Sequence, residues 1–200
     1  MRHPYRTIGL LVLALALAQP AIAQRRKAAA PVENGEMLSQ SCFACHGVRG
    51  ASGAAPMPII GGQPEDYLRN NLQSFKDAIR PATVMTRLMR GYSDAEIAAI
   101  AKYFSEQPFL RAEQPVDSGK VEMGMKVYQR VCKDCHLRGG REPSEAEYPV
   151  VAGQWLPYMQ MTMVDIVSGA RIVDEKFQAA LGKVTRDELE AVLHYFAAQR

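Results

Sequence analysis

The chain contains two copies of one pattern, and this repeat constrains the fold more than any other feature of the sequence. The segment MPIIGGQPEDYLRNNLQSFKDAIR (Met57–Arg80) aligns with YPVVAGQWLPYMQMTMVDIVSGAR (Tyr148–Arg171) at a constant offset of 91 residues. The motifs CFACH and CKDCH, and the later segments YSDAEIAAIAKYF and VTRDELEAVLHYF, repeat in the same order. The sequence therefore predicts two similar units, at 34–107 and 119–200, joined by a proline-containing linker at 108–118.

Each unit is predicted to be helical, because helix-start patterns precede segments with one apolar face. Ser93 with Glu96, and Thr185 with Glu188, have the spacing of a capping box. Strand-like alternation of polar and apolar residues is nearly absent, so we expect an all-α fold. The other expected helices span 36–41, 65–78, 123–131 and 155–168.

The first residues have the pattern of an export signal. A basic start is followed by a short apolar run and by AIA, and this pattern predicts a signal peptide at 1–23. A flexible leader is expected at 24–33, the protein is expected in the periplasm, and no segment after cleavage is expected to span a membrane. The net charge of the whole chain is only +3, and no basic tract indicates binding to nucleic acid.

All the cysteines of the chain lie in two Cys-x-x-Cys pairs, and a histidine directly follows each pair. This is the attachment motif of c-type haem, in which two thiols react with the vinyl groups and the histidine binds the iron. A shared zinc site or a thioredoxin-like redox pair remains as an alternative. We expect two covalently bound haem c groups. The residues are Cys42, Cys45 and His46 in the first unit and Cys132, Cys135 and His136 in the second.

A proline follows each histidine at nearly the same distance in the two units. Pro58 and Pro149 lie within the repeated segments, 12 and 13 residues beyond His46 and His136. A proline carbonyl at this position is expected to accept the proton of the outer ring nitrogen and to fix the imidazole. The alternative role for either proline is a turn before the next helix.

These residues resemble the two-haem periplasmic cytochromes c, and within that group the haem subunit of flavocytochrome c sulfide dehydrogenase. The segments that carry the resemblance are AGQWLPY (152–158) and RGYSDAEIAAIAKYF (90–104). The resemblance implies two tandem class I cytochrome c-like domains. It also implies a flavoprotein dehydrogenase as electron donor and a soluble cytochrome or an oxidase as electron acceptor.

The resemblance also implies a methionine as the sixth ligand of each iron, eight residues before the Ser or Thr that caps the last helix. In the first unit this position is Met85, with Met89 as its rival. In the second unit the position is Phe177, which cannot bind iron. Lys176 and the methionines within 159–163 are the substitutes that we consider, and His194 is expected to face solvent. We therefore expect the second haem to be five-coordinate or weakly ligated.

The sequence predicts electron transfer as the function, either as a non-catalytic subunit of a dehydrogenase complex or as a freestanding two-haem carrier. A protein that binds ligands at an open second haem is the alternative from another class. The segment GQWLPYM (153–159) is expected either to contact a partner protein or to pack in a haem pocket.

Overall fold

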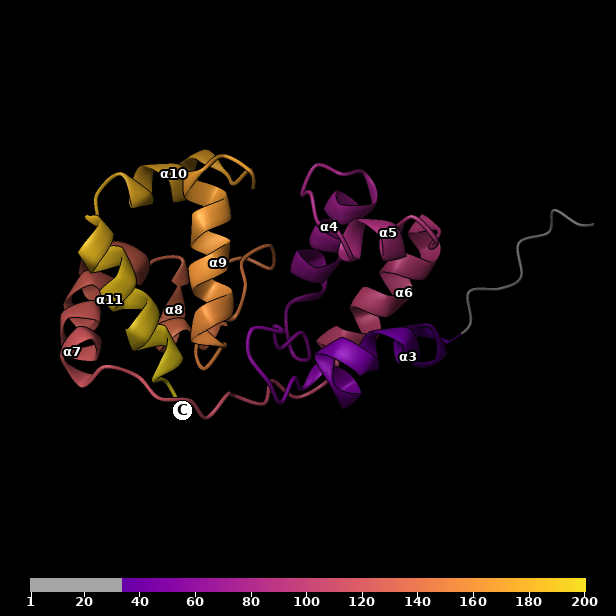
Figure 1. The fold of residues 1–200 in the computed structure, drawn as a ribbon, viewed down its shortest axis with the longest axis horizontal. Helices are drawn as coiled ribbons and strands as arrows, with labels where there is room; N and C mark the ends of the chain where they lie inside the picture. Colours follow the sequence, from indigo (N-terminus) through magenta and orange to yellow (C-terminus); the bar gives the residue numbers. More distant parts are fainter. Residues whose placement is uncertain (1–33) are drawn as a thin grey trace, which may run out of the picture. The chain divides into compact units, whose positions relative to one another are not determined.

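The computed structural model describes residues 34–200. The predicted signal peptide and leader lie outside the described residues. Helices and short turns of helix make up nearly all the regular structure of residues 34–200 (Figure 1). The elements are α3 (Gly35–His46), η2 (Val48–Gly50), α4 (Glu65–Lys76), α5 (Met85–Met89), α6 (Asp94–Ser105), α7 (Ser118–Val127), η3 (Tyr128–Cys132), α8 (Leu137–Gly140), β1 (Glu142–Pro143), α9 (Leu156–Val167), α10 (Glu175–Leu181) and α11 (Arg186–Ala197).

The first copy is built on the packing of α3 and α4 against α6. The capping box at the start of α6 is present, because Ser93 and Glu96 each bind the backbone of the other. The apolar face of α6 then lies in a core with Leu68 of α4, and Phe104 is almost completely buried there. A methyl group on Gly35 would lie 2.4 Å from the carbonyl oxygen of Ala99, so only glycine lets α3 approach α6 this closely.

The second copy repeats this arrangement with α7 and α9 against α11. The capping box of Thr185 and Glu188 starts α11, and Phe196 lies in its core. A methyl group on Gly124 would meet the carbonyl oxygen of Ala191, as in the first copy. The predicted duplication is therefore present in the packing of the helices as well as in the sequence.

A backbone contact shared by both copies joins the repeated loop to the end of the last helix. The amide of Gly62 donates to the carbonyl of Phe104, and the amide of Gly153 donates to that of Phe196, both at 2.8 Å. Both glycines have a positive φ (70° and 74°), a conformation that other residues adopt only with strain. The same local sequence thus makes the same turn twice.

Two glutamines at equivalent positions hold the copies together. The side chain of Gln63 donates to the carbonyl of Val150 and accepts from its amide, both at 2.9 Å. The side chain of Gln154 makes the same two bonds to Ile59, at 2.9 and 3.0 Å. Both side chains are buried, so each pair of bonds satisfies backbone groups that water cannot reach. The contact is reciprocal, because each copy gives the other the same residue.

The expected helices are confirmed with small shifts of their ends, and three short elements were not expected. Residues 36–41 are part of the longer α3, and residues 123–131 are divided between α7 and η3. The elements α5, α8 and α10 lie in segments for which no helix was predicted, because runs of four to seven residues leave too little periodicity to recognise. Among residues 34–200, no helix combines the length and the apolar character needed to cross a bilayer.

The prediction that His194 faces solvent is wrong. The side chain is buried, and its Nδ1 accepts a hydrogen bond from the amide of Asp117 at 3.1 Å. The equivalent residue of the first copy, Lys102, is exposed and pairs with Glu106. The difference arises because the backbone that leads into α7 packs over α11.

Candidate haem-binding site

The first Cys-x-x-Cys-His motif ends α3, so the helix itself positions its cysteines and its histidine. Nδ1 of His46 lies 3.0 Å from the carbonyl oxygen of Pro58, as the sequence predicted. Burial lowers the pKa of His46, and the hydrogen bond to Pro58 opposes this effect only in part. A neutral imidazole that donates from Nδ1 keeps the lone pair of Nε2 free to bind a metal.

The second motif follows a local irregularity in its helix. The turn η3 is a π-helix that ends at Cys132, and His136 lies just beyond it, buried against Phe196. Burial lowers the pKa of His136 to about 4, although the carbonyl of Pro149 acts in the opposite direction. Its Nδ1 is buried without a well-formed hydrogen bond. This imidazole is also neutral at pH 7 and suited to bind a metal.

None of the four cysteines forms a disulfide bond. Burial raises the pKa of Cys42, and burial together with Cys135 raises the pKa of Cys132 to about 11. Thiols of this kind are not activated nucleophiles, which argues against redox chemistry like that of thioredoxin. No group of three or more His, Cys, Asp or Glu side chains within 34–200 is arranged as a shared site for a metal ion.

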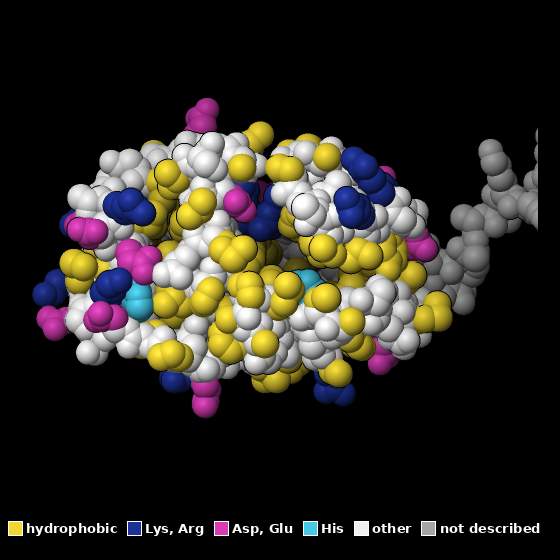
Figure 2. Space-filling model, in the orientation of Figure 1, with side chains coloured by type: hydrophobic (Ala, Val, Ile, Leu, Met, Phe, Trp, Pro, Cys, Tyr) yellow, Lys and Arg dark blue, Asp and Glu magenta, His cyan; other side chains and the backbone are white. Residues whose placement is uncertain are grey.

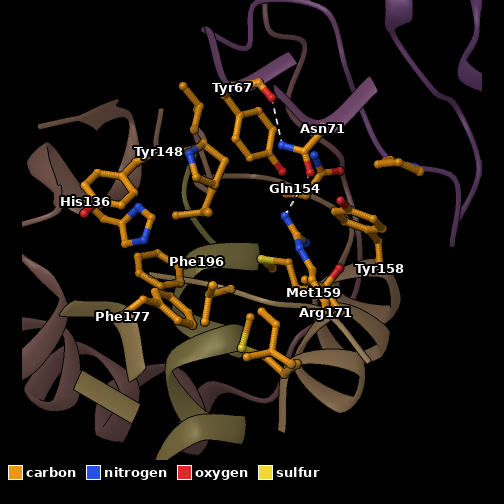
Figure 3. A pocket seen from close by; sticks show the side chains of 18 of the residues that line it. Tyr67, Asn71, His136, Tyr148, Gln154, Tyr158, Met159, Arg171, Phe177 and Phe196 are labelled. Carbon is orange, nitrogen blue, oxygen red and sulfur yellow. Dashed lines mark hydrogen bonds between the residues drawn. The ribbon is translucent and has the colours of Figure 1, made fainter. Parts of the chain in front are cut away.

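A cavity of about 430 Å³ lies beside the second motif. Cys132, His136 and Phe177 line it, and Figure 3 shows the rings of His136 and Phe177 together in this pocket, with Met159 reaching it from α9. The lining continues to residues of the first copy such as Ile60 and Tyr67. In Figure 2 a hollow is visible between the two copies, with dark-blue basic side chains on its wall.

Two arginines meet in this cavity at equivalent positions of the two copies. Arg80 donates to the side-chain oxygen of Asn71 at 2.8 Å, and Arg171 donates to the same atom at 3.1 Å. Tyr67 and Tyr158, another equivalent pair, lie beside them (Figure 3). Burial raises the pKa of Tyr158, but the two guanidinium groups outweigh this effect and lower it to about 8.

This Arg–Tyr cluster has positive charge without a partner of opposite sign. Among residues 34–200, no carboxylate lies within 4 Å of the guanidinium nitrogens of Arg80 or Arg171. Two partly buried cations of this kind favour an anionic group, and carboxylates suit a guanidinium best. This cluster was not predicted from the sequence, although both pairs of residues are matched at the same offset in the repeat.

These features fit haem c. The free thiol pairs and neutral histidines provide the covalent anchors and an axial ligand. The largely apolar cavity beside His136 would hold a flat apolar ring, and the Arg–Tyr cluster would supply hydrogen-bond donors to carboxylate side groups. The residues of the chain therefore suit the cofactor that the motifs predicted.

The two candidates for the sixth ligand in the first copy lie on the same short helix. Met85 begins α5 and is half-buried, whereas Met89 ends this helix and is almost completely buried in the core. A methionine in the core has a packing role of its own. This placement is consistent with the preference for Met85, which stays a prediction.

In the second copy, Lys176 is not desolvated, although binding to iron would require a neutral, desolvated amine. Its ammonium group is exposed and lies 3.3 Å from the carboxylate of Glu145. This hydrogen bond raises the pKa of Lys176, whereas binding to iron requires a neutral amine. The neighbouring Phe177 lines the cavity instead.

Part of the segment 153–159 lines the cavity, as its expected role in a haem pocket predicts, because Gln154, Tyr158 and Met159 belong to the lining. Gln154 binds the first copy, and the indole nitrogen of Trp155 donates to the carbonyl of Ser52 at 3.2 Å. Leu156 and Met159 are buried in the second core. The segment also joins the two copies, and its expected role as a surface for a partner protein stays a prediction.

Comparisons with known proteins agree with this site. The cytochrome c family matches residues 32–107. Cytochrome c4 of Stutzerimonas stutzeri is 30% identical over 190 residues, which cover 84% of this chain and 89% of that protein. The crystal structure of reduced recombinant cytochrome c4 from Pseudomonas stutzeri matches with a TM-score of 0.73 and 27% identity, over 83% of this chain and 97% of that one.

Two further relatives have names that indicate a dehydrogenase. The thiosulfate dehydrogenase electron acceptor of Thiomonas intermedia is 29% identical over 184 residues, which cover 86% of this chain and 82% of that protein. The cytochrome subunit of sulfide dehydrogenase from Chlorobaculum tepidum is 44% identical, but over 70 residues that cover only 35% of this chain and 63% of that protein. The expected likeness to a sulfide dehydrogenase subunit is therefore partial, whereas the likeness to cytochrome c4 extends over most of the chain. The chain has the all-α fold of two tandem class I cytochrome c domains, and it belongs to the cytochrome c4 family of haem c-containing proteins.

Proposed function

We propose that the protein is a periplasmic electron carrier with two covalently bound haem c groups, one in each copy. The domain boundaries proposed for these units are 34–107 and 119–200. The observation that carries the proposal is the presence, in both copies, of a neutral buried histidine beside a pair of free thiols. Haem bound in this way supplies one-electron oxidation and reduction of its iron.

The residues of the chain prepare this chemistry in three ways. The carbonyl of Pro58 fixes the ring of His46, so that the iron-binding nitrogen needs no reorientation. The apolar core around Phe104 and Phe196 excludes water from the neighbourhood of both motifs. The reciprocal bonds of Gln63 and Gln154 keep the two copies at a fixed separation, as a relay between two redox groups requires.

The test is the haem content of the full chain, produced with the machinery for c-type haem attachment. Mass spectrometry should show two covalently bound haems, and a redox titration should show two one-electron steps. A matched pair of variants, Cys45→Ser and Cys135→Ser, should each leave one haem with the full set of thioether bonds. A native chain with one haem or none contradicts the proposal.

We also propose that the electron donor is an exported dehydrogenase that oxidises a reduced sulfur compound. The names of two relatives support this class of partner. The surface of α9 supports it as well, because Met161, Val164 and Val167 are each more than half exposed there. At the equivalent positions of α4 the chain has Asn70, Gln73 and Lys76.

The partner is tested by purification of the protein from its native periplasm. A bound dehydrogenase, reduced by thiosulfate or sulfide and passing electrons to this protein, is the expected result. Val164→Lys should slow this transfer, whereas the matched change Gln73→Lys on α4 should not. Equal rates in both variants would argue against α9 as the contact surface. If no dehydrogenase is purified with the protein, a freestanding carrier serving an oxidase is the better description.

A further inference from the structure

The residue at the position expected for a methionine ligand in the second copy is Phe177, and the structure places it in the cavity. Asp174 caps α10, and its carboxylate accepts a hydrogen bond from the amide of Phe177 at 2.8 Å. The cap holds the start of this helix in place. Phe177 and His136 both line the cavity, where Phe196 packs against the ring of His136 (Figure 3).

Three other candidate ligands of the second copy are excluded by where they lie. Lys176 is at the surface and pairs with Glu145. Met161 is 57% exposed and does not line this cavity. His194 is absent from the lining, and both of its ring nitrogens have neighbours, the amide of Asp117 and the carboxylate of Glu190.

Two methionines do line the cavity, but the repeat assigns them a packing role. Met159 and Met163 occupy the positions that Leu68 and Leu72 have in the first copy. Those leucines pack in the core of the first copy, and the two methionines pack in the same way in the core of the second. Met159 is only 5% exposed and sits in the core with residues of α7 and α11. No methionine follows Met163 in the sequence.

We propose that His136 is the only protein ligand of the iron in the second copy, and that the pocket covered by Phe177 binds a small neutral diatomic molecule such as carbon monoxide or nitric oxide. This inference rests on the proposed function, because it requires a haem in the second copy. It separates the two copies by role. The first passes electrons with both axial positions filled by the protein, and the second has a position open to a ligand.

The lining of the pocket selects the kind of ligand. Val173, Phe177, Leu181 and Val184 present apolar surface, which favours a neutral molecule over a hydrated ion. Anions such as azide or cyanide should therefore bind more weakly than carbon monoxide does.

The experiment is a titration of the dithionite-reduced, full-length holoprotein with carbon monoxide, followed by its absorption spectrum. We expect one molecule bound per chain that carries two haems. In the oxidised protein, the near-infrared sulfur-to-iron charge-transfer band should have the intensity of one haem. Two haems without carbon monoxide binding, or a charge-transfer band of two-haem intensity, would overturn the inference. One haem per chain would instead contradict the proposed function.

Three variants sharpen the result. Phe177→Met restores a thioether at the expected position and should abolish carbon monoxide binding while doubling the charge-transfer band. The matched control Phe177→Leu, which offers no ligand, should keep the stoichiometry of one. The double variant Met159→Leu/Met163→Leu should also bind one molecule of carbon monoxide per chain. If the native protein binds none and this double variant binds one, a methionine of α9 is the ligand and the inference is wrong. The native titration decides the inference even if a variant fails to mature.

Discussion

The segment after the middle helix is built differently in the two copies, although the helices around it are nearly the same. In the first copy, α5 begins at Met85 without a side-chain cap. In the second copy, Asp174 caps α10 and Phe177 takes the place of the methionine. The cores, capping boxes and glycine contacts are present in both copies, whereas the residue eight positions before the last helix cap is Met85 in one and Phe177 in the other. The packing of the helices is therefore the same in the two copies, although the residues at these two positions differ.

The largest expected effect comes from removing the anchors of one copy at a time. The double variant Cys132→Ser/Cys135→Ser should lose the second haem and leave its cavity without a filling group. Small domains have a stability of only about 5–15 kcal/mol, so we expect the second copy to be unfolded while the first keeps its haem. Circular dichroism and the mass of the chain measure both effects.

The matched variant Cys42→Ser/Cys45→Ser should give the opposite result, with the first copy unfolded. It should also abolish the sulfur-to-iron charge-transfer band, because Met85 belongs to that copy. A band that survives in this variant would show that the second copy has a thioether ligand, and the difference between the copies would disappear.

A smaller effect is expected from the reciprocal glutamines. Gln63→Ala leaves the buried amide and carbonyl of Val150 without a partner and Gln154→Ala leaves those of Ile59, which costs about 1–3 kcal/mol for each group. Gln154→Ala also removes the acceptor of the part-buried amide of Trp155. Chemical denaturation should show similar losses of stability in both variants. The control Gln73→Ala removes an exposed side chain bonded to Asp77 and should change little. A large difference between Gln63→Ala and Gln154→Ala would show that the contact is not equivalent on its two sides.

The smallest effect concerns the dependence of stability on pH. Hydrogen bonds to Ser93 and Thr185 lower the pKa of Glu96 and Glu188 below the usual value of 4.5. The folded state therefore favours the ionised carboxylates, and their contribution is present above pH 4.5 and is lost as the pH falls through the lowered pKa.

The changes Glu96→Gln and Glu188→Gln should each make the stability of the protein less dependent on pH in this acid range. The effect should be larger for Glu188, which also binds Arg130 at 2.6 Å. Thermal melting between pH 3 and 6 is the measurement. A steeper dependence on pH in either variant would contradict this account of the capping boxes.

The features that the sequence predicted well are those fixed by nearby residues. The capping boxes, the long helices and the bond from His46 to Pro58 follow from local spacing. The bonds of Gln154 and Trp155 to the first copy were not predicted, because they depend on how the two copies pack. His194 was misplaced for the same reason, since a bond across the chain decides its burial. The charge of Arg80 and Arg171 was visible in the repeat, but their meeting in one cavity was not.

The exchange of identical bonds by Gln63 and Gln154 is the form of contact made by two identical subunits related by a two-fold axis. In an assembly of identical subunits, one gene encodes both partners, so every substitution occurs in both. Joining the partners in a single polypeptide ends this constraint. One copy can then have Phe177 where the other has Met85, while the symmetric contact made by Gln63 and Gln154 is kept.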